Sequence, residues 1–263
     1  MSADHPLDRL PFGRVLVDGM PRHCLFDGDL VRLLDRPAYE AGAVEQGTVA
    51  GAATRPLAPV LPTKVVAVGL NYRAHAAELA MDLKPEPIIF IKPPSAVIGP
   101  GEPIVMPPAS AQVDYEAELA LVVGRRCRSL SPDEAADAVA GYTCGNDVTA
   151  RDLQKVDGQW TRAKSFDTFC PLGPAAVRDA PPPAAVVTAA IDGVEVQRGR
   201  VGDMIVSPLE LLVFVSGVMT LEAGDVILTG TPPGVGPLAA GQVVTITVEG
   251  VGELSNRVVA GGL

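Results

Sequence analysis

The 263-residue sequence is short of aromatic side chains, which make up only 4% of it. Apolar residues as a whole still reach 48%, so aliphatic side chains have to fill the core. The 27 glycines and 25 prolines are spread along the chain, which favours many short strands and turns over long helices. The length suits one large domain, or one domain with a small companion.

Cysteine is also scarce, and its spacing argues against two kinds of site. The four cysteines, Cys24, Cys127, Cys144 and Cys170, form no Cys-x-x-Cys pair. We therefore expect neither a zinc cage nor a disulfide framework, and reduced thiols are the simpler interpretation.

Basic clusters and long apolar runs are missing as well. The net charge is −10 without any Lys/Arg-rich run, which argues against nucleic acid or an anionic membrane as the main partner. No apolar run reaches the ~18 residues that would span a bilayer, and the N-terminal segment has no apolar signal core. We therefore expect a cytoplasmic protein. A small anionic substrate stays open, because one local cation or metal ion can outweigh the overall charge.

Residues 12–60 have the pattern of a small β unit. Two alternating segments, "GRVLVDG" and "HCLFDGDLVRLL", contain Asp-Gly turns. The polar, proline-containing segment after them is typical of a connection. The predicted boundary lies near residue 60, with an N-terminal β domain and linker over 1–60 and a catalytic domain over 61–263.

The rest of the chain combines many strand patterns with few helical ones. The apolar run 64–70 predicts a buried strand, and "AVVTAAIDGVEVQ" predicts a hairpin around Asp192-Gly193. Helical patterns are short, and the predicted helices lie in residues 71–81, "SPDEAADAVAGY" with Ser131 as N-cap, "VTARDLQKV", and "SPLELLVFVSGVM" from Ser207-Pro208. Because the helices do not alternate regularly with strands, we predict a strand-rich α+β fold.

The stretch "VDYEAELALVVG", residues 113–124, places carboxylates on a strand that enters a core. Its first half alternates apolar and acidic residues, and its second half is continuously apolar. Glu116 and Glu118 are two positions apart and share one face of the strand. Their charges repel at the edge of a dry region, and a divalent cation compensates this most effectively. Asp147 is a candidate third ligand, and three hard carboxylates suit Mg²⁺ or Mn²⁺.

An ordinary amphipathic strand with a solvent-exposed acidic face explains the same spacing, and on spacing alone it is the commoner case. The change to "LALVV" weakens that interpretation for Glu118. It does not weaken it for Asp114, which we expect to be exposed or to neighbour the ligands.

Six blocks follow one another from Lys64 to the C-terminus: "KVVAVGLNYRAHAAEL", "PIIFIKPPSAVIGPG", "VDYEAELALVVGRR", "GYTCGNDVTARDLQ", "WTRAKSFDTFCPLGP" and "GDVILTGTPPGVGP". Together they resemble the fumarylacetoacetate hydrolase family, in its short acylpyruvate hydrolase and oxaloacetate decarboxylase branch. One block alone is weak evidence for the family, whereas six blocks in the family's order are specific evidence. The resemblance implies a mixed β-sandwich or roll with few helices, and a homodimer with one Mg²⁺ or Mn²⁺ ion per subunit.

The same resemblance implies a role for each candidate site residue. The metal ligands would be Glu116, Glu118 and Asp147. The catalytic residues would be His75, Glu78 and Lys164. The residues that bind substrate would be Arg151, Gln154 and Thr231.

His75 and Glu78 lie three positions apart and are adjacent on one helix face. A carboxylate beside an imidazole orients it and raises its basicity, so the pair is suited to act as a general base on water. For an isolated His-x-x-Glu, an ordinary surface helix is the better explanation, and the surrounding block is what favours the pair. In the family this helix belongs to a lid over the metal.

The other three side chains also have ordinary explanations. Lys164 would pair with an acid ligand or hold a substrate oxygen, and a solvated lysine is the alternative. Arg151 would grip a carboxylate, and a structural ion pair with Asp152 or another acid is about as plausible. Thr231 lies in a Gly/Pro loop that binds substrate carboxylate in the family, where a plain turn is the alternative.

One segment departs from the family pattern. Many relatives carry a polar Gly-Asn-Thr-Ser segment that ends in Phe, and this chain has "GRVGDMIV", residues 199–206, in its place. Arg200, Val201 and Gly202 replace the polar trio, and Val206 replaces the Phe. The substrate therefore cannot simply be carried over from close relatives.

These observations predict a metal-dependent enzyme that acts on a 2-oxo or 2,4-dioxo acid through a pyruvate enolate. Water attack would cleave the C3–C4 bond of an acylpyruvate or a fumarylpyruvate-like acid, and loss of CO₂ from oxaloacetate forms the same enolate. The alternatives are an isomerase or decarboxylase of the 2-hydroxyhepta-2,4-diene-1,7-dioate type in aromatic catabolism, a biosynthetic enzyme for a larger diketide, and an inactive binding or structural homologue.

Overall fold

The computed structural model describes residues 9–78 and 84–262, and this part of the chain is strand-rich with short helices, as predicted. The largest sheet is built from β1 (Phe12–Val17), β2 (Met20–Asp27), β3 (Leu30–Leu34), β4 (Glu45–Ala50), β5 (Arg55–Pro56), β6 (Val65–Gly69), β7 (Ile88–Lys92), β8 (Val97–Ile98), β11 (Ala117–Val123), β12 (Val139–Asn146), β14 (Cys170–Val177) and β17 (Val226–Leu228). Its order is β4-β3-β2-β1-β14-β12-β11-β17-β6-β7, with β5 beside β1 and β8 beside β14.

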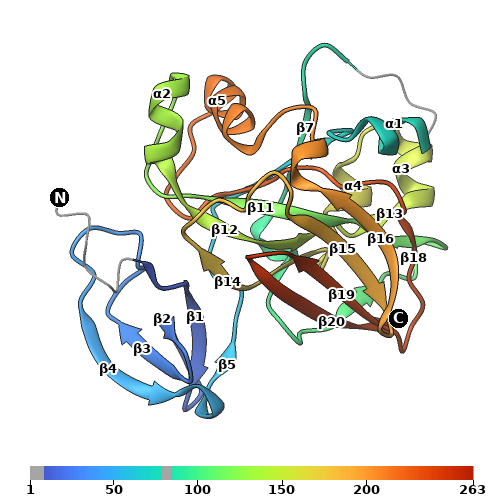
Figure 1. The fold of residues 1–263 in the computed structure, drawn as a ribbon. Coiled ribbons are helices and arrows are strands. Elements are labelled where there is room, and N and C mark those ends of the chain that lie inside the picture. The colour runs from blue at the N-terminus through green and yellow to red at the C-terminus, as the bar shows by residue number, and fades with distance from the viewer. Residues whose placement is uncertain (1–8, 79–83, 263) are drawn as a thin grey trace.

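A second sheet has the order β16-β15-β19-β20-β9, and a small third one has the order β13-β10-β18. Their strands are β9 (Ile104–Met106), β15 (Val186–Ile191), β16 (Val194–Arg200), β19 (Val243–Val248), β20 (Gly252–Ala260), β10 (Val113–Tyr115), β13 (Thr149–Ala150) and β18 (Gly236–Pro237). The second sheet packs against β11 and β12 (Figure 1), which gives the mixed, sandwich-like architecture that was expected.

Strand β11 lies at the centre of the core and is buried along its whole length. Leu119 and Leu121 belong to the cluster that includes β15 and β19, whereas Ala120 and Val122 belong to the cluster on the opposite face. Glu118 is in phase with Ala120 and Val122, since side chains two apart share a face. The strand therefore carries its carboxylates along a face that the protein covers.

The N-terminal β unit is present as predicted, with β1, β2 and β3 joined as antiparallel hairpins. Asp18 and Gly19 both have positive φ (49° and 77°), as a two-residue hairpin turn requires. The prediction of a plain connection after them is wrong, because β4 and β5 form within it and pair with β3 and β1. The unit joins the main sheet where β1 pairs with β14, and the boundary near residue 60 stays a prediction.

The helices are α1 (Arg73–Glu78), α2 (Pro132–Ala135), α3 (Arg151–Asp157), α4 (Thr161–Lys164) and α5 (Pro208–Val218). Helix α5 begins as predicted, because the Ser207 hydroxyl caps the Glu210 N–H. The helix predicted after Ser131 is shorter than expected. After α2 it is only a 3₁₀ turn (Ala136–Ala138), because Val139 already starts β12. The predicted end of the helix over 71–81 lies outside the described residues.

Helices α1, α3 and α4 gather near β7 and β13 (Figure 1), which concentrates their side chains at one edge of the β11 sheet. Within the ranges that the structure describes, no helix has the length and apolar character that crossing a membrane requires.

Asp225 ties the chain before β6 to the start of β17. Its Oδ1 accepts hydrogen bonds from the Thr63 N–H (2.9 Å), the Thr63 hydroxyl (2.7 Å) and the Lys64 N–H (3.1 Å). Its Oδ2 accepts from Lys64 Nζ (2.5 Å) and from the Glu222 N–H (2.8 Å). Burial alone would raise the pKa of Asp225, but these hydrogen bonds and the Lys64 charge lower it below its ordinary value.

Replacing Asp225 by the isosteric Asn should lower the free energy of unfolding by about 1–3 kcal/mol at pH 7, because several donors lose a charged acceptor. A folded-state pKa below the ordinary value of about 3.9 means that this stabilisation is complete above that pH and is lost as the pH falls further. Urea unfolding of both proteins from pH 7 towards pH 3 should therefore show a shrinking difference, and a difference independent of pH would contradict this account.

Candidate active site

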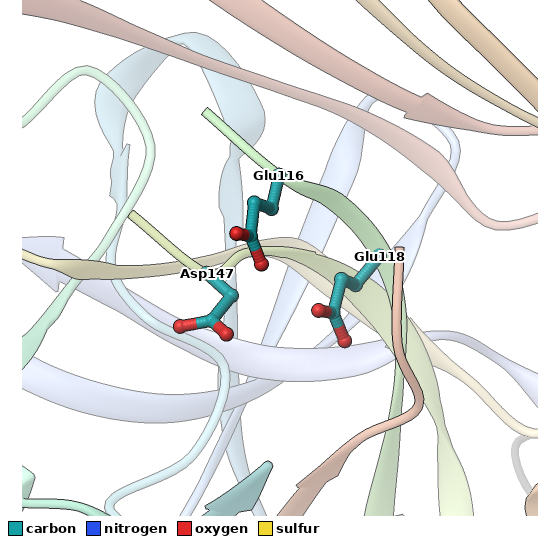
Figure 2. Close-up of side chains that lie close together, drawn as sticks. All are labelled: Glu116, Glu118 and Asp147. Carbon is teal, nitrogen blue, oxygen red and sulfur yellow. The ribbon is translucent and has the colours of Figure 1, made fainter. Parts of the chain in front are cut away.

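Three carboxylates meet where β11 pairs with β12. The antiparallel register sets Ala117 opposite Asn146, so that Glu116 and Asp147 are neighbours across the ladder. The Asp147 N–H donates to the Glu116 carbonyl (3.0 Å), which fixes the two backbones together. Oxygen atoms of Glu116, Glu118 and Asp147 lie within 4.8 Å of one another, and Figure 2 shows the three side chains converging.

The acidic face of the opening strand is buried, which excludes the alternative of an ordinary amphipathic strand with a solvent-exposed acidic face. Glu116 is 4% exposed, and Glu118 and Asp147 are each 1% exposed. Asp114 is also buried, so the exposed interpretation of this residue is wrong. It pairs with Arg151, which also pairs with Glu116. The reason for the burial is tertiary: β13 and β18 flank β10 on both sides and take the place of water.

Buried cations surround the carboxylates. Lys164 Nζ donates to Glu116 Oε2 (2.9 Å) and to Asp147 Oδ2 (2.6 Å). Lys92 Nζ donates to Asp147 Oδ1 (2.5 Å) from the end of β7. Both lysines are almost fully buried. The carboxylate partners offset the cost of removing each ammonium group from water.

Arg151 is the third cation, and it forms the structural ion pair that the sequence left open. Its Nε donates to Asp114 Oδ2 (2.8 Å) and its Nη2 to Glu116 Oε1 (2.5 Å). The partner is not Asp152, which accepts instead from the Ser110 hydroxyl (2.6 Å). Arg151 Nη1 also donates to Gln154 Oε1 (2.7 Å), which brings both predicted substrate residues to the pocket wall.

The positive charges are distributed unevenly around the carboxylates. Burial alone would raise the pKa of Glu116, but Lys164 and Arg151 hold it well below its ordinary value. Burial, followed by the charges of Asp147 and Glu116, raises the pKa of Glu118 well above its ordinary value. Glu118 accepts the Gly230 N–H (2.6 Å), and among the described residues no Lys or Arg side chain pairs with it.

This imbalance fits a divalent cation. Four buried carboxylates (Asp114, Glu116, Glu118 and Asp147) face three buried cations (Lys92, Arg151 and Lys164). Positive charge is missing beside Glu118, which is where the oxygens of the three converging carboxylates meet. Hard, closely spaced carboxylate oxygens are the donor set that Mg²⁺ and Mn²⁺ prefer.

His75 and Glu78 form the predicted pair on α1. His75 Nδ1 lies 3.0 Å from Glu78 Oε2, and Glu78 Oε1 accepts the N–H of Gly234 (2.9 Å) from the Gly/Pro loop. A neutral imidazole that donates from Nδ1 to this carboxylate has an unprotonated Nε2, which is the form a general base needs. His75 is 4% exposed and lines the same pocket as Glu116 and Asp147.

Thr231 lies in the pocket wall, but its hydroxyl is already engaged. It donates to the Ala117 carbonyl (2.9 Å) and accepts from Gln197 Nε2 (2.7 Å). The neighbouring Gly230 has a φ of 96°, and a Cβ there would lie 2.6 Å from Asn71 Cβ, so only glycine fits. The loop is therefore built to bring the Gly230 N–H to Glu118.

The cavity between these side chains is small, about 20 Å³, which is room for one ion or one water molecule. A second cavity of about 190 Å³ shares the wall Val68–Leu70 with it. An organic substrate held at the carboxylates has to extend beyond the first cavity.

Residues 64–259 match the family described as fumarylacetoacetate (FAA) hydrolase, C-terminal. The chain belongs to this family. It is 52% identical over 199 residues to an uncharacterised protein of Methanocaldococcus jannaschii, across 76% of this chain and 84% of that one. It is 43% identical over 216 residues to the mitochondrial oxaloacetate tautomerase FAHD2A of Bos taurus, across 77% of this chain and 69% of that one.

Solved structures of family members share the fold. A 2-hydroxyhepta-2,4-diene-1,7-dioate isomerase from Mycobacterium marinum is 40% identical, with a TM-score of 0.89 over 97% of this chain and 100% of that one. A fumarylpyruvate hydrolase from Pseudomonas aeruginosa, in complex with Mn²⁺ and pyruvate, is 33% identical, with a TM-score of 0.72 over 78% of this chain and 91% of that one. The predicted family and fold are thus confirmed, and family members include hydrolases, isomerases and tautomerases. The role assigned to each site residue stays a prediction.

The sequence prediction missed Lys92 and the burial of Asp114. Lys92 ends the apolar run "PIIFIK" inside a family block, and an ionisable residue at the end of an apolar strand pattern is a signal that could have identified it.

Replacing Glu118 by Gln should change stability in opposite directions with and without metal. Without a divalent ion, the substitution replaces a carboxyl group whose charged form is disfavoured by burial and by two neighbouring carboxylates, so the variant should unfold at a higher temperature than the wild type. With Mn²⁺ in excess, the wild type should gain stability by binding, and the order should reverse. Thermal unfolding in EDTA and in Mn²⁺ measures the difference in unfolding temperature between the two proteins under each condition. If Mn²⁺ raised the unfolding temperature of both proteins by the same amount, Glu118 would not be a metal ligand.

Proposed function

We propose that this chain is a metal-dependent hydrolase that cleaves the C3–C4 bond of 2,4-dioxo acids. The observation that carries the proposal is that His75, which is paired with Glu78, lines one pocket with the carboxylates Glu116 and Asp147. The family includes hydrolases, and the Pseudomonas aeruginosa relative is a fumarylpyruvate hydrolase with Mn²⁺ and pyruvate. Mg²⁺ or Mn²⁺ is the proposed cofactor, held by Glu116, Glu118 and Asp147.

A bound divalent ion would supply positive charge for the substrate oxygens on which negative charge develops. The protein prepares its ligands for that task. Lys164 and Arg151 hold Glu116 ionised, and Lys92 and Lys164 together hold Asp147 in place. Both acids are thereby fixed by the protein before any ligand arrives.

The His75–Glu78 pair then moves the proton. His75 Nε2 takes a proton from water, and the resulting hydroxide adds to the C4 carbonyl of the substrate. Collapse of the tetrahedral adduct breaks the C3–C4 bond, which leaves a carboxylic acid and the enolate of pyruvate. The histidinium, held by Glu78, returns its proton to C3, and pyruvate forms. One water is consumed for each bond that breaks.

Tautomerisation of oxaloacetate is a second candidate, because a relative with that activity is 43% identical over 77% of this chain. It needs only proton transfer at C3 and at the C2 oxygen, which the same histidine can serve. Decarboxylation of oxaloacetate and isomerisation of a 2-hydroxy-diene dioate use the same enolate chemistry and stay alternatives, as does an inactive homologue. A homodimer in the cytoplasm also stays a prediction.

His75→Asn should lower kcat for acetylpyruvate hydrolysis by roughly 10²- to 10⁴-fold, the usual contribution of a general base. Affinity for Mn²⁺ should stay near that of the wild type, because His75 is not a proposed ligand. Parallel assays of oxaloacetate tautomerisation by the wild type and the variant distinguish the second candidate function from the hydrolase. His23→Asn, which alters a histidine on β2, is the matched control. If kcat of the His75 variant stayed within about threefold of the wild-type value, the general-base role would be ruled out, because a general base usually contributes far more than threefold.

A further inference from the structure

A buried glutamine of the second sheet, Gln197, bonds the strand that carries the acidic residues. It lies on β16 and is 2% exposed. Its Oε1 accepts the N–H of Ala117 (3.0 Å), which is the residue between Glu116 and Glu118. Its Nε2 donates to the Thr231 hydroxyl (2.7 Å). One side chain thus joins the strand of the proposed ligands to the Gly/Pro loop.

The Thr231 hydroxyl closes a ring of three hydrogen bonds. It accepts from Gln197 Nε2 and donates to the Ala117 carbonyl (2.9 Å), while the Ala117 N–H donates to Gln197 Oε1. We call this ring the Ala117 clasp. The ladder between β11 and β17 ends where the Thr229 N–H donates to the Leu119 carbonyl (3.1 Å). Beyond that point the clasp takes the place of a strand, and both backbone groups of Ala117 are satisfied by side chains.

Glu118 is held differently from the other two proposed ligands. Buried lysines pair with Glu116 and Asp147, whereas within the described ranges no Lys or Arg side chain pairs with Glu118. Glu118 Oε2 accepts instead from the Gly230 N–H (2.6 Å). The clasp joins the residue before Glu118 to the residue after Gly230, so it fixes the backbone of both partners in that hydrogen bond.

The position of Glu118 matters because divalent ions differ in the geometry that they accept. Mg²⁺ needs near-ideal octahedral geometry with oxygens at about 2.0–2.1 Å, whereas Ca²⁺ takes about six to eight oxygens at about 2.3–2.6 Å in flexible arrangements. Ligands that cannot move therefore favour the smaller ion. A set with one loose carboxylate adapts to the larger ion and loses that preference.

We propose that Gln197 is a positioning residue that holds Glu118 through the Ala117 clasp, and that the site thereby selects Mg²⁺ or Mn²⁺ over Ca²⁺. Gln197 is not among the residues that line the small cavity, so it acts through Ala117 and Thr231. The inference rests on the metal ion of the proposed function. Its test uses ion binding alone, so the outcome does not depend on which reaction the protein catalyses.

Gln197→Met keeps the size of the side chain and removes its hydrogen bonds. It should raise the Kd for Mn²⁺ by about tenfold, which is typical when a group that orients a metal ligand is lost. Thr231→Val breaks the clasp from its other side, should act in the same direction, and covers the case in which the Met variant does not fold. Because both substitutions open one ring, the double variant should lose less affinity than the product of the two separate losses. Electron paramagnetic resonance of free Mn²⁺, without substrate, measures each Kd.

Competition of Mg²⁺ and of Ca²⁺ with bound Mn²⁺ gives the ratio of the two affinities, in which a general loss of affinity cancels. Either clasp variant should lower the preference for Mg²⁺ over Ca²⁺ by roughly threefold or more. Gln242→Met is the matched control, because Gln242 Oε1 also accepts a backbone N–H, that of Ala239 (2.7 Å), just before β19. This variant should leave the Kd for Mn²⁺ and the ion ratio unchanged.

A wild-type ion ratio in both clasp variants would overturn the proposal, whether or not Mn²⁺ bound more weakly. A change of the same size in Gln242→Met would overturn it too, because ion binding would then follow overall stability instead of the clasp. If the wild type binds none of the three ions, the proposed metal site is wrong and the inference falls with it. If the ions bind as expected and acetylpyruvate is not hydrolysed, the role of Gln197 stands and the hydrolase function alone is wrong.

Discussion

Repulsion among three buried carboxylates is the constraint on which the rest of this site depends. Oxygens of Glu116, Glu118 and Asp147 lie within 4.8 Å of one another, and all three side chains are almost fully buried. Such an arrangement persists only if positive charge offsets both the repulsion and the loss of hydration. Lys164 and Lys92 supply that charge beside Glu116 and Asp147. Among the described residues no Lys or Arg side chain pairs with Glu118, and this is why the site suits a divalent ion.

The fold enforces this arrangement through strand pairing. Because both faces of β11 are packed, the strand cannot rotate to release Glu118 into solvent, and its pairing with β12 keeps Asp147 in place. Asn71 couples the start of helix α1 to the same frame, since its side-chain amide donates to the Thr229 carbonyl (2.7 Å) beside β17 and also holds the segment around Val206. Helix α1, which carries His75, and the strand that carries Glu118 are thus held by one set of contacts.

Local features of this structure could be predicted from sequence, and features that depend on distant segments could not. The hairpin at Asp192-Gly193 and the start of α5 at Ser207 follow from turn and cap chemistry within a few residues. The burial of Asp114 depends on β13 and β18, which come from far along the chain, so alternation alone suggested exposure. Spacing alone favoured an exposed face for the acids, and the prediction that they are metal ligands rested on the apolar run after Glu118 and, above all, on the family blocks.

Anomalous diffraction from crystals soaked in Mn²⁺ tests the central claim most directly. The account predicts one peak per subunit between the carboxylates of Glu116, Glu118 and Asp147, with ligand oxygens at about 2.0–2.3 Å, in the range of hard divalent ions. Lys92 and Lys164 should still contact the outer oxygens of Asp147 and Glu116. A structure without a peak at this point, with Glu118 paired to a protein cation instead, would contradict it.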